Sequence, residues 1–217
     1  MKNIPVFTAA AGVATLILAE IPHKQIAYIL IRSVWTDAAA LLEECIRFCR
    51  MAGAETVYAS WEDRALPGEP AYDMLSMTCR KADLPAPAAP VELVALTPEN
   101  GPDYLSIYQQ CFRSVPGAAT YTHRDLARLY DTDMAWLARK DGCFAAIAEI
   151  SREGLEGIGV LPEFRGLGFD LAAAVLRMVP SLTVSLKVAS TNLRAIALYE
   201  RLGFVRERVV SRWWKVL

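Results

Sequence analysis

Residues 160–171 read VLPEFRGLGFDL and pass from a predicted strand through a short glycine-containing loop into an alanine-rich helix. Backbone N–H groups at a helix N-terminus carry partial positive charge, and glycines allow an anion to approach them closely. Arg165 adds a full positive charge beside Gly166 and Gly168. The segment therefore predicts a phosphate-binding loop at the end of a sheet strand, and it restricts the chain to folds that contain such a loop.

Two widespread phosphate-binding motifs do not match this loop. A dinucleotide-binding fold needs a third glycine three residues after Gly168, where Leu171 stands. A P-loop needs a Gly-Lys-Ser/Thr sequence, which this chain lacks. The loop therefore belongs to another class of anion-binding fold.

A second informative segment, residues 192–204, reads NLRAIALYERLGF. It places Asn192 at a helix start, Tyr199 about two turns later and Gly203 at the helix end, which is typical of a capped helix. One predicted strand, residues 183–188, separates this helix from the loop segment.

Together and in this order, the two segments resemble the GCN5-related N-acetyltransferase (GNAT) family. Its pattern is Arg/Gln-x-x-Gly-x-Gly/Ala followed by Asn-x-x-Ala-x-x-x-Tyr-x-x-x-Gly-Phe, and the similar order of elements covers about residues 91–217. The resemblance implies an α/β (α+β) fold with a mixed, mostly antiparallel sheet flanked by helices. It also implies an enzyme that moves an acetyl group from acetyl-CoA to an amine by direct transfer in a ternary complex.

The resemblance also implies a set of cofactor contacts. The loop 165–170 would hold the coenzyme A pyrophosphate through main-chain N–H groups, and the strand residues 158–160 would line the pantetheine arm by strand addition. A backbone N–H of the same strand would hold the thioester oxygen, and Asn192 would contact the arm. The implied cofactor-binding residues are Ile158, Gly159, Val160, Arg165, Gly166, Leu167, Gly168, Phe169, Asp170 and Asn192.

Two residues are expected to move protons. The resemblance implies Tyr199 as the general acid that protonates the departing thiolate. Since an amine must be neutral to attack a thioester, a carboxylate base is also expected near the centre of the sheet. Glu156, on the strand that leads into the loop, is the first candidate, with Glu149 and Glu153 behind it. The alternatives are a solvated carboxylate at each glutamate and a core aromatic at Tyr199.

Asp170 departs from the family pattern, which has glycine or alanine at the sixth position of the loop. A carboxylate in the first turn of a helix faces the same positive pole that a pyrophosphate would use. Either this carboxylate points away as a cap, or it weakens coenzyme binding by like-charge repulsion. The second outcome leads to an alternative function, a non-catalytic coenzyme-binding or scaffold protein with a GNAT fold.

The segment 84–90 contains three prolines and no apolar periodicity, which is typical of an extended linker. It predicts a division into residues 1–83, a degenerate GNAT-like N-terminal half, the linker 84–90, and the GNAT domain 91–217. The chain would then contain tandem GNAT-like halves.

Sequence similarity between the two halves favours an internal duplication over a chance resemblance. Residues 37–42 resemble residues 170–176, and residues 72–77 resemble residues 199–204. In the first half a strand passes directly into a helix at residues 35–37, with no counterpart of the phosphate-binding loop. This half is therefore not expected to hold a pyrophosphate.

Hydrophobic periodicity and capping residues predict the remaining elements. Strands are expected over residues 13–19, 26–35, 56–60, 76–81, 91–96, 134–139, 143–150, 155–161, 183–188 and 204–216. Helices are expected over residues 37–52, 97–112, after 122, 168–178 and 192–201, with Thr36 or Asp37 as the first N-cap.

Composition excludes several classes of partner and site. A net charge of -1 supplies no broad field for nucleic acid or a membrane surface. The partner that the family resemblance implies is a small-molecule or peptide amine acceptor. Residues 9–19, the longest apolar stretch, are shorter than the roughly 20 residues needed to cross a bilayer. Five cysteines without a CxxC pair and two histidines predict no metal site and indicate reduced thiols in a cytoplasmic protein.

Overall fold

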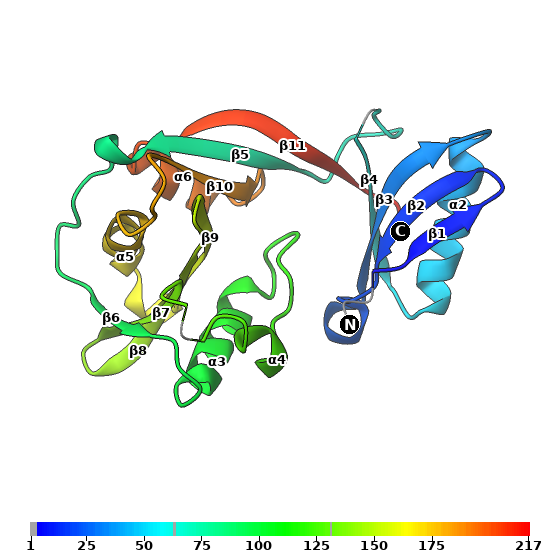
Figure 1. Ribbon diagram of the computed structural model, residues 1–217. Coiled ribbons are helices and arrows are strands. Elements are labelled where there is room, and N and C mark those ends of the chain that lie inside the picture. Colours follow the sequence, from blue (N-terminus) through cyan, green and yellow to red (C-terminus); the bar gives the residue numbers. More distant parts are fainter. Residues whose placement is uncertain (1–3, 63, 131) are drawn as a thin grey trace. The chain divides into compact units, whose positions relative to one another are not determined.

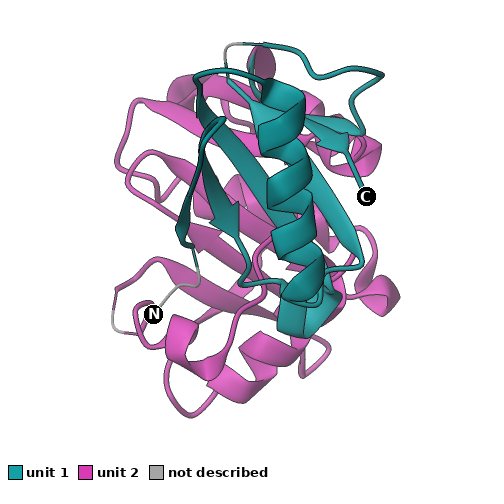
Figure 2. Ribbon diagram, turned by 90° about the vertical axis from the view of Figure 1, so that its right-hand side faces the viewer, with its two compact units in different colours: residues 1–74, 209–217 teal, residues 75–208 magenta. Residues whose placement is uncertain are grey.

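The computed structural model describes residues 4–62, 64–130 and 132–217. The chain forms two compact units, unit 1 (residues 1–74 and 209–217) and unit 2 (residues 75–208) (Figure 1, Figure 2). It enters unit 2 within strand β5 (Tyr72–Arg80) and returns to unit 1 within strand β11 (Val205–Lys215).

Unit 1 consists of a sheet with one long helix packed on it. The strand order is β1, β2, β3, β4 and the end of β11, where β1 to β3 are antiparallel neighbours and β4 lies parallel to β3. Helix α2 buries Leu41, Cys45 and Cys49 against the sheet. Asp37 caps α2 as predicted, because its carboxylate accepts a hydrogen bond from the Ala39 N–H at 2.8 Å. The elements are β1 (Val6–Ala9), β2 (Gly12–Ile17), α1 (Ile21–Lys24), β3 (Ile26–Val34), α2 (Ala38–Met51) and β4 (Thr56–Trp61).

Unit 2 contains a larger sheet with the strand order β5, β10, β9, β8, β7, β6. Strands β6 to β9 are antiparallel neighbours, and β10 lies parallel to β9. Its strands after β5 are β6 (Glu92–Ala95), β7 (Ala135–Lys140), β8 (Cys143–Ile150), β9 (Gly154–Val160) and β10 (Thr183–Ala189). Its helices are the short 3-10 turns η1 (Lys81–Asp83) and η2 (Pro162–Phe164) and the α-helices α3 (Gly101–Phe112), α4 (His123–Leu126), α5 (Leu167–Leu176) and α6 (Leu193–Arg201).

The sheet of unit 2 lies between two layers of helices. Along β8, Ala146, Ala148 and Ile150 belong to the hydrophobic cluster that contains residues of α5 and α6. Ile147 belongs to the cluster that contains residues of α3 and α4. Because successive strand residues point to opposite faces, α5 and α6 cover one face of this sheet and α3 and α4 cover the other.

Both units contain the same succession of three antiparallel strands, a helix and a parallel strand. In unit 1 this is β1, β2, β3, α2 and β4, with the short helix α1 between β2 and β3, and in unit 2 it is β7, β8, β9, α5 and β10, with the 3-10 turn η2 before α5. The two successions differ at the parallel pair. Strand β4 stays paired with β3 from Ile26↔Thr56 to Ile31↔Trp61, whereas β10 pairs with β9 only at Ser185↔Gly154 and Leu186↔Leu155.

The proline-containing segment 84–90 lies inside unit 2 rather than at the boundary between the compact units. Strand β5, expected as the last element of the N-terminal half, contributes Met77 and Cys79 to the same hydrophobic cluster as Leu84 and the residues of α5. The compact units therefore divide the chain near residue 74 and again near residue 208.

Most predicted elements are confirmed, although the short helix α1 and the two 3-10 turns were not predicted and several other elements differ. Strand β1 was not predicted, and β5 begins at Tyr72 rather than at residue 76. The expected correspondence of residues 72–77 with the end of a helix is wrong, because these residues form a strand. Helix α3 begins at Gly101 rather than at residue 97, since the Asn100 side chain accepts from the Thr97 N–H at 2.9 Å and holds a turn there.

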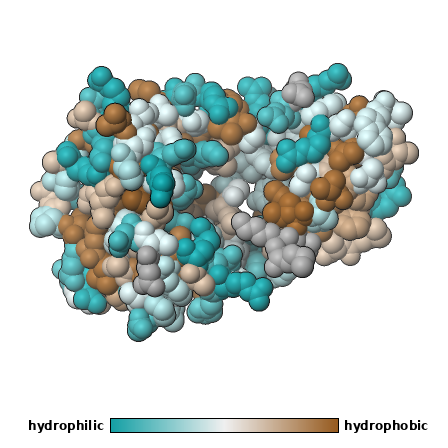
Figure 3. All heavy atoms as spheres, in the orientation of Figure 1, coloured by the Kyte–Doolittle hydropathy of each residue, from teal (hydrophilic) through white to brown (hydrophobic). Residues whose placement is uncertain are grey.

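Hydrophobic residues make up 54 % of the chain, and much of that fraction lies in three buried clusters. On the face drawn in Figure 3, polar and apolar residues are intermixed. Within the described part of the chain, no helix combines the length and the hydropathy needed to span a membrane.

Candidate functional site

Strands β9 and β10 separate after two residue pairs, which leaves an open strand edge. In the described chain, residues 156–160 of β9 have no register partner in β10. On its other side the same stretch stays paired with β8, from Glu149↔Gly157 to Ala146↔Val160. The backbone N–H and C=O groups that point away from β8 can therefore pair with an extended ligand that carries amide groups.

A β-bulge and a glycine explain why the strands separate at this point. Glu149 pairs with Gly157 and Ile150 with Leu155, so Glu156 is an extra residue in β9. Such a bulge bends its strand and increases the local twist, which turns the end of β9 away from its neighbour. Before the bulge the backbones are very close, because a Cβ atom on Gly154 would lie 1.7 Å from the Ser185 carbonyl oxygen.

The loop after β9 leads into a helix with an uncapped N-terminus. Gly166 is the N-cap of α5 with φ 104° and ψ -29°, a left-handed conformation that glycine adopts without strain. No side chain caps this helix, so the N–H groups of its first turn are available to an anion. The Arg165 side chain, one residue earlier, is exposed. These features match the predicted phosphate-binding loop.

The Asp170 carboxylate is engaged by residues 84–90. Its Oδ1 accepts hydrogen bonds from the backbone N–H groups of Ala88 at 2.6 Å and Ala89 at 3.4 Å. Farther along α5, the Arg177 guanidinium donates to the Leu84 carbonyl at 2.9 Å. Asp170 and Arg177 together bind residues 84–90 to α5. This contact accounts for the acidic residue at this position of the loop.

Helix α6 presents Asn192 and Tyr199. The Asn192 Oδ1 accepts from the Ala195 N–H at 3.2 Å and caps the helix, so its side-chain amide N–H groups are left as donors. Tyr199 is buried, and its ring centroid lies 6.0 Å from that of Phe204. Burial raises the pKa of Tyr199 to about 12, so the hydroxyl keeps its proton at neutral pH and can donate it.

The end of β9, the loop and α6 converge on one side of the sheet. A Cβ atom on Gly168 would lie 3.7 Å from both Val160 of β9 and Leu198 of α6. Ile158, Val160, Leu167 and Phe169 all pack against the hydrophobic cluster that contains Tyr199. The fold therefore brings Ile158, Val160 and residues 167–169 together with the cluster that contains Tyr199, whereas a Cβ atom on Gly159 would face Cys111 and Phe112 of α3.

Arg201 joins this group and was not predicted. Its guanidinium carbon lies 5.0 Å from the centroid of the Phe169 ring. In the sequence Arg201 is a basic residue in the last turn of a predicted helix, which is common. It contacts Phe169 only because α6 packs beside the loop.

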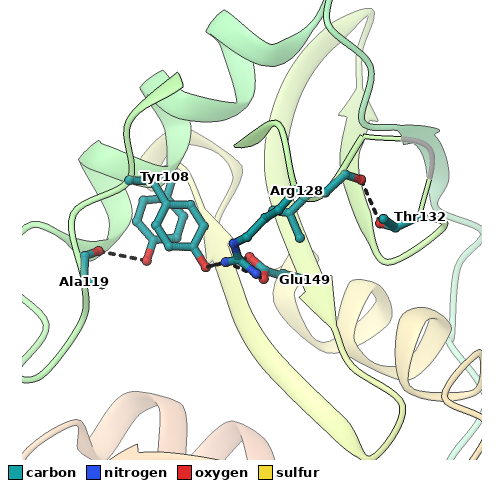
Figure 4. Close-up of polar contacts among 7 residues, drawn as sticks. Tyr108, Ala119, Arg128, Thr132 and Glu149 are labelled. Atoms are coloured by element: carbon teal, nitrogen blue, oxygen red, sulfur yellow. Dashed lines mark hydrogen bonds and ion pairs between the residues drawn. The ribbon is translucent and has the colours of Figure 1, made fainter. Parts of the chain in front are cut away.

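The opposite face of the sheet carries a buried carboxylate, Glu149 of β8, whose side chain is oriented by a tyrosine and an arginine. The Tyr121 hydroxyl donates to Glu149 Oε2 at 3.0 Å, and Arg128 Nη2 lies 3.3 Å from Oε1 (Figure 4). Arg128 Nη2 also donates to the Tyr121 hydroxyl oxygen at 2.7 Å. Burial raises the pKa of Glu149, the charge of Arg128 and the Tyr121 hydrogen bond oppose this rise, and the charge of Glu156 adds to it.

Glu156 lies at the bulge close to Glu149, because its charge raises the pKa of Glu149. Leu155 and Ile158 both pack in the cluster on the α5 side, so the bulge interrupts the alternation of faces between them. Glu149 shares a face with its pairing partner Gly157. A Cβ atom on Gly157 would lie 3.3 Å from Phe112 of α3, which marks this face as the α3 side. Glu156 is exposed at the bulge, whereas Glu153 lies in the turn before β9 and takes no part in this arrangement.

Sequence reasoning did not find Tyr104, Tyr121 and Arg128, which surround Glu149. One signal was available, because residues 145–150 read AAIAEI and a carboxylate inside such an apolar strand needs polar partners. No local pattern shows which residues those partners are.

Comparison with known proteins places this site in a family. Residues 101–204 match the model of the acetyltransferase (GNAT) family. A GCN5-related N-acetyltransferase from Sphaerobacter thermophilus is 17 % identical, with a TM-score of 0.61 over 94 % of this chain and 76 % of that chain. One from Kribbella flavida is 17 % identical, with a TM-score of 0.60 over 98 % and 89 %.

A tandem GNAT protein from the clavulanic acid biosynthesis pathway is 18 % identical to this chain. The TM-score is 0.51 over 97 % of this chain and 81 % of that chain. No curated protein matches the chain. At these identities the structural likenesses show the fold, whereas the family match covers the bulged strand, the loop and α6. Residues 101–204 therefore form a domain of the acetyltransferase (GNAT) family.

Proposed function

We propose that this chain transfers an acetyl group from acetyl-CoA to a primary amine, by direct transfer in a ternary complex, and that unit 2 holds the cofactor. The separation of β9 from β10 beside an uncapped helix carries this proposal. Coenzyme A presents amide groups along its arm and a pyrophosphate at its end, which need an open strand edge and an anion-binding helix terminus. Both lie next to each other at the end of β9.

The residues available for the cofactor fit its chemical groups. The first-turn N–H groups of α5, over residues 167–169, would hold the pyrophosphate, with Arg165 adding positive charge. The open edge at Ile158, Gly159 and Val160 would pair with the amides of the arm, and the Asn192 amide would donate to it. Acetyl-CoA supplies the acetyl group in the activated form of a thioester.

Tyr199 and Glu156 are the proposed proton donor and proton acceptor. Tyr199 holds its proton at neutral pH because burial raises its pKa, so it can donate to a thiolate. Glu156 is exposed at the bulge and free of ion pairs within the described chain, which leaves its carboxylate available to an ammonium group. Glu149 is less suited as a base, because Tyr121 and Arg128 already engage both of its oxygens.

Calorimetry with acetyl-CoA, followed by an assay of thiol release with a panel of primary amines, tests the proposed function. One acetyl-CoA should bind per chain, and at least one amine should accelerate thiol release. No detectable binding at millimolar acetyl-CoA would overturn the proposal. Binding without amine-dependent release would instead support the alternative, a non-catalytic coenzyme-binding or scaffold protein.

The expected stoichiometry of one follows from the structure of unit 1. Strands β3 and β4 stay paired from Ile26↔Thr56 to Ile31↔Trp61, and Asp37 caps α2, so the described part of this unit lacks the separated parallel strands and the uncapped following helix that form the site of unit 2. The shared succession of elements supports the interpretation that the N-terminal half is a degenerate GNAT-like copy.

Asp170→Ala tests whether the acidic residue in the loop repels the cofactor. Its carboxylate is bound by the N–H groups of Ala88 and Ala89, so we expect its loss to lower the free energy of unfolding by about 1 kcal/mol. The dissociation constant of acetyl-CoA, measured by calorimetry, should stay within about twofold. A tenfold gain in affinity, about 1.4 kcal/mol, would show that the carboxylate repels the pyrophosphate after all.

A further inference from the structure

Glu149 and Glu156 leave an uncompensated negative charge on the α3 side of the sheet. Arg128 forms an ion pair with Glu149 at 3.3 Å, and within the described chain Glu156 has no such partner. Two carboxylates therefore lie near a single guanidinium. This group of residues, in which Glu156 and Arg128 are exposed and Glu149 and Tyr104 are buried, is called the acidic face below and also includes Phe112.

Tyr104 adds unused hydrogen-bonding capacity to the acidic face. Its side chain is 0 % exposed, and its hydroxyl has no hydrogen-bond partner within the described chain. Burial raises the pKa of Tyr104, and among the neighbouring charges Glu149 adds most to the rise, so the hydroxyl lies within electrostatic range of that carboxylate. A buried hydroxyl without a partner is costly, which indicates that a polar group from outside the chain completes this site.

Aromatic rings cover the rest of the acidic face. Phe112 lies over Gly157, next to the bulge. Tyr108 stacks between Phe112 and Tyr121, with ring centroids 4.6 and 4.1 Å away. Aromatic rings and carboxylates both attract a cation, and the rings also accommodate an apolar chain attached to it.

We infer that the acidic face selects acceptors whose ammonium group has no neighbouring carboxylate, so that primary amines on an aromatic or aliphatic chain are preferred over amino acids. This inference rests on the proposed function and names its substrate class. A carboxylate beside the ammonium group would approach Glu149 and Glu156 and be repelled by them. Arg128 offsets this repulsion only in part, because its single positive charge is paired with Glu149 and Glu156 has no ion-pair partner within the described chain.

Matched acceptor pairs that differ only in the carboxylate test the inference. The pairs are tyramine with tyrosine, phenethylamine with phenylalanine and cadaverine with lysine. In each pair kcat/KM, measured by thiol release, should be at least about tenfold higher for the amine without the carboxylate. Equal use of both members would overturn the inference, and a preference for the amino acid would overturn it and indicate that Arg128 receives the acceptor's carboxylate.

A binding measurement keeps the test independent of turnover. Calorimetry with the CoA-saturated protein should show tighter binding of tyramine than of tyrosine, and Glu156→Gln should remove most of that difference. Asp103→Asn, which deletes an exposed carboxylate of α3, is the matched control and should preserve it. An unchanged difference in Glu156→Gln would overturn the inference. Failure of the proposed function is recognised separately, because acetyl-CoA would then not bind, or no amine of the panel would accelerate thiol release.

Discussion

Replacing Tyr199 by phenylalanine should lower kcat by about 100-fold, which is the size expected for the loss of one positioned proton donor. The substitution removes only the hydroxyl, and the buried ring keeps its contact with Phe204. The dissociation constant of acetyl-CoA should therefore change by less than about twofold, because this interaction stabilises the departing thiolate rather than the bound cofactor. Steady-state kinetics and calorimetry measure the two quantities.

The raised pKa of Tyr199, about 12, makes the prediction specific in its pH dependence. A group with that pKa stays protonated over the usual assay range, so the ratio of wild-type to Tyr199→Phe kcat should be constant from about pH 7 to about pH 10. Tyr58→Phe in unit 1 makes the same chemical change away from the proposed site and should leave kcat unchanged. Equal losses of turnover and cofactor affinity in Tyr199→Phe would contradict the role of proton donor.

Gly154→Ala should destabilise unit 2 by at least about 3 kcal/mol, at the upper end of the usual cost of overpacking. A Cβ atom at this position would lie 1.7 Å from the Ser185 carbonyl oxygen, and also within 2.9 Å of the Ser185 backbone nitrogen. Backbone atoms cannot rotate away as a side chain can. The substitution therefore breaks one of the two residue pairs that join β9 to β10.

Urea unfolding combined with hydrogen exchange of the β9 and β10 amides measures this loss in the unit concerned. Gly168→Ala is the matched control, because its Cβ atom would meet its nearest neighbours at 3.7 Å, an ordinary contact distance. A loss below about 1 kcal/mol in Gly154→Ala would mean that the strands can part at this end too. The close contact between Gly154 and Ser185 would then not fix the position at which β9 leaves β10.

The motifs of the site were readable from the sequence because their signals are local. A left-handed glycine before a helix, an asparagine at an N-cap and apolar periodicity act within a few residues of backbone. Asn192 caps its helix as expected, and the strand before the loop and the helix after it each begin one residue before the expected position. The roles implied for these residues stay predictions until the experiments above are done.

Features that depend on distant partners could not be predicted in the same way. Asp170 and Ala88 are 82 residues apart, and Glu149 and Tyr121 are 28 residues apart. No local sequence pattern identifies these partners. The sequence alone therefore does not decide whether the Asp170 carboxylate points away from the cofactor or repels it. The structure shows that this carboxylate is bound by residues 84–90. The division into units also depends on long-range pairing, because β5 and β11 each contribute residues to both units.

The sequence by itself determined the phosphate-binding loop, its helix and the family pattern, because backbone preference and hydrophobic periodicity act over short stretches. The tertiary structure decided where β9 leaves β10, which carboxylates share the acidic face and what Asp170 binds. Each of these features depends on which distant segments pack together. That packing is determined by the burial of whole helices and strands, because no single motif specifies it.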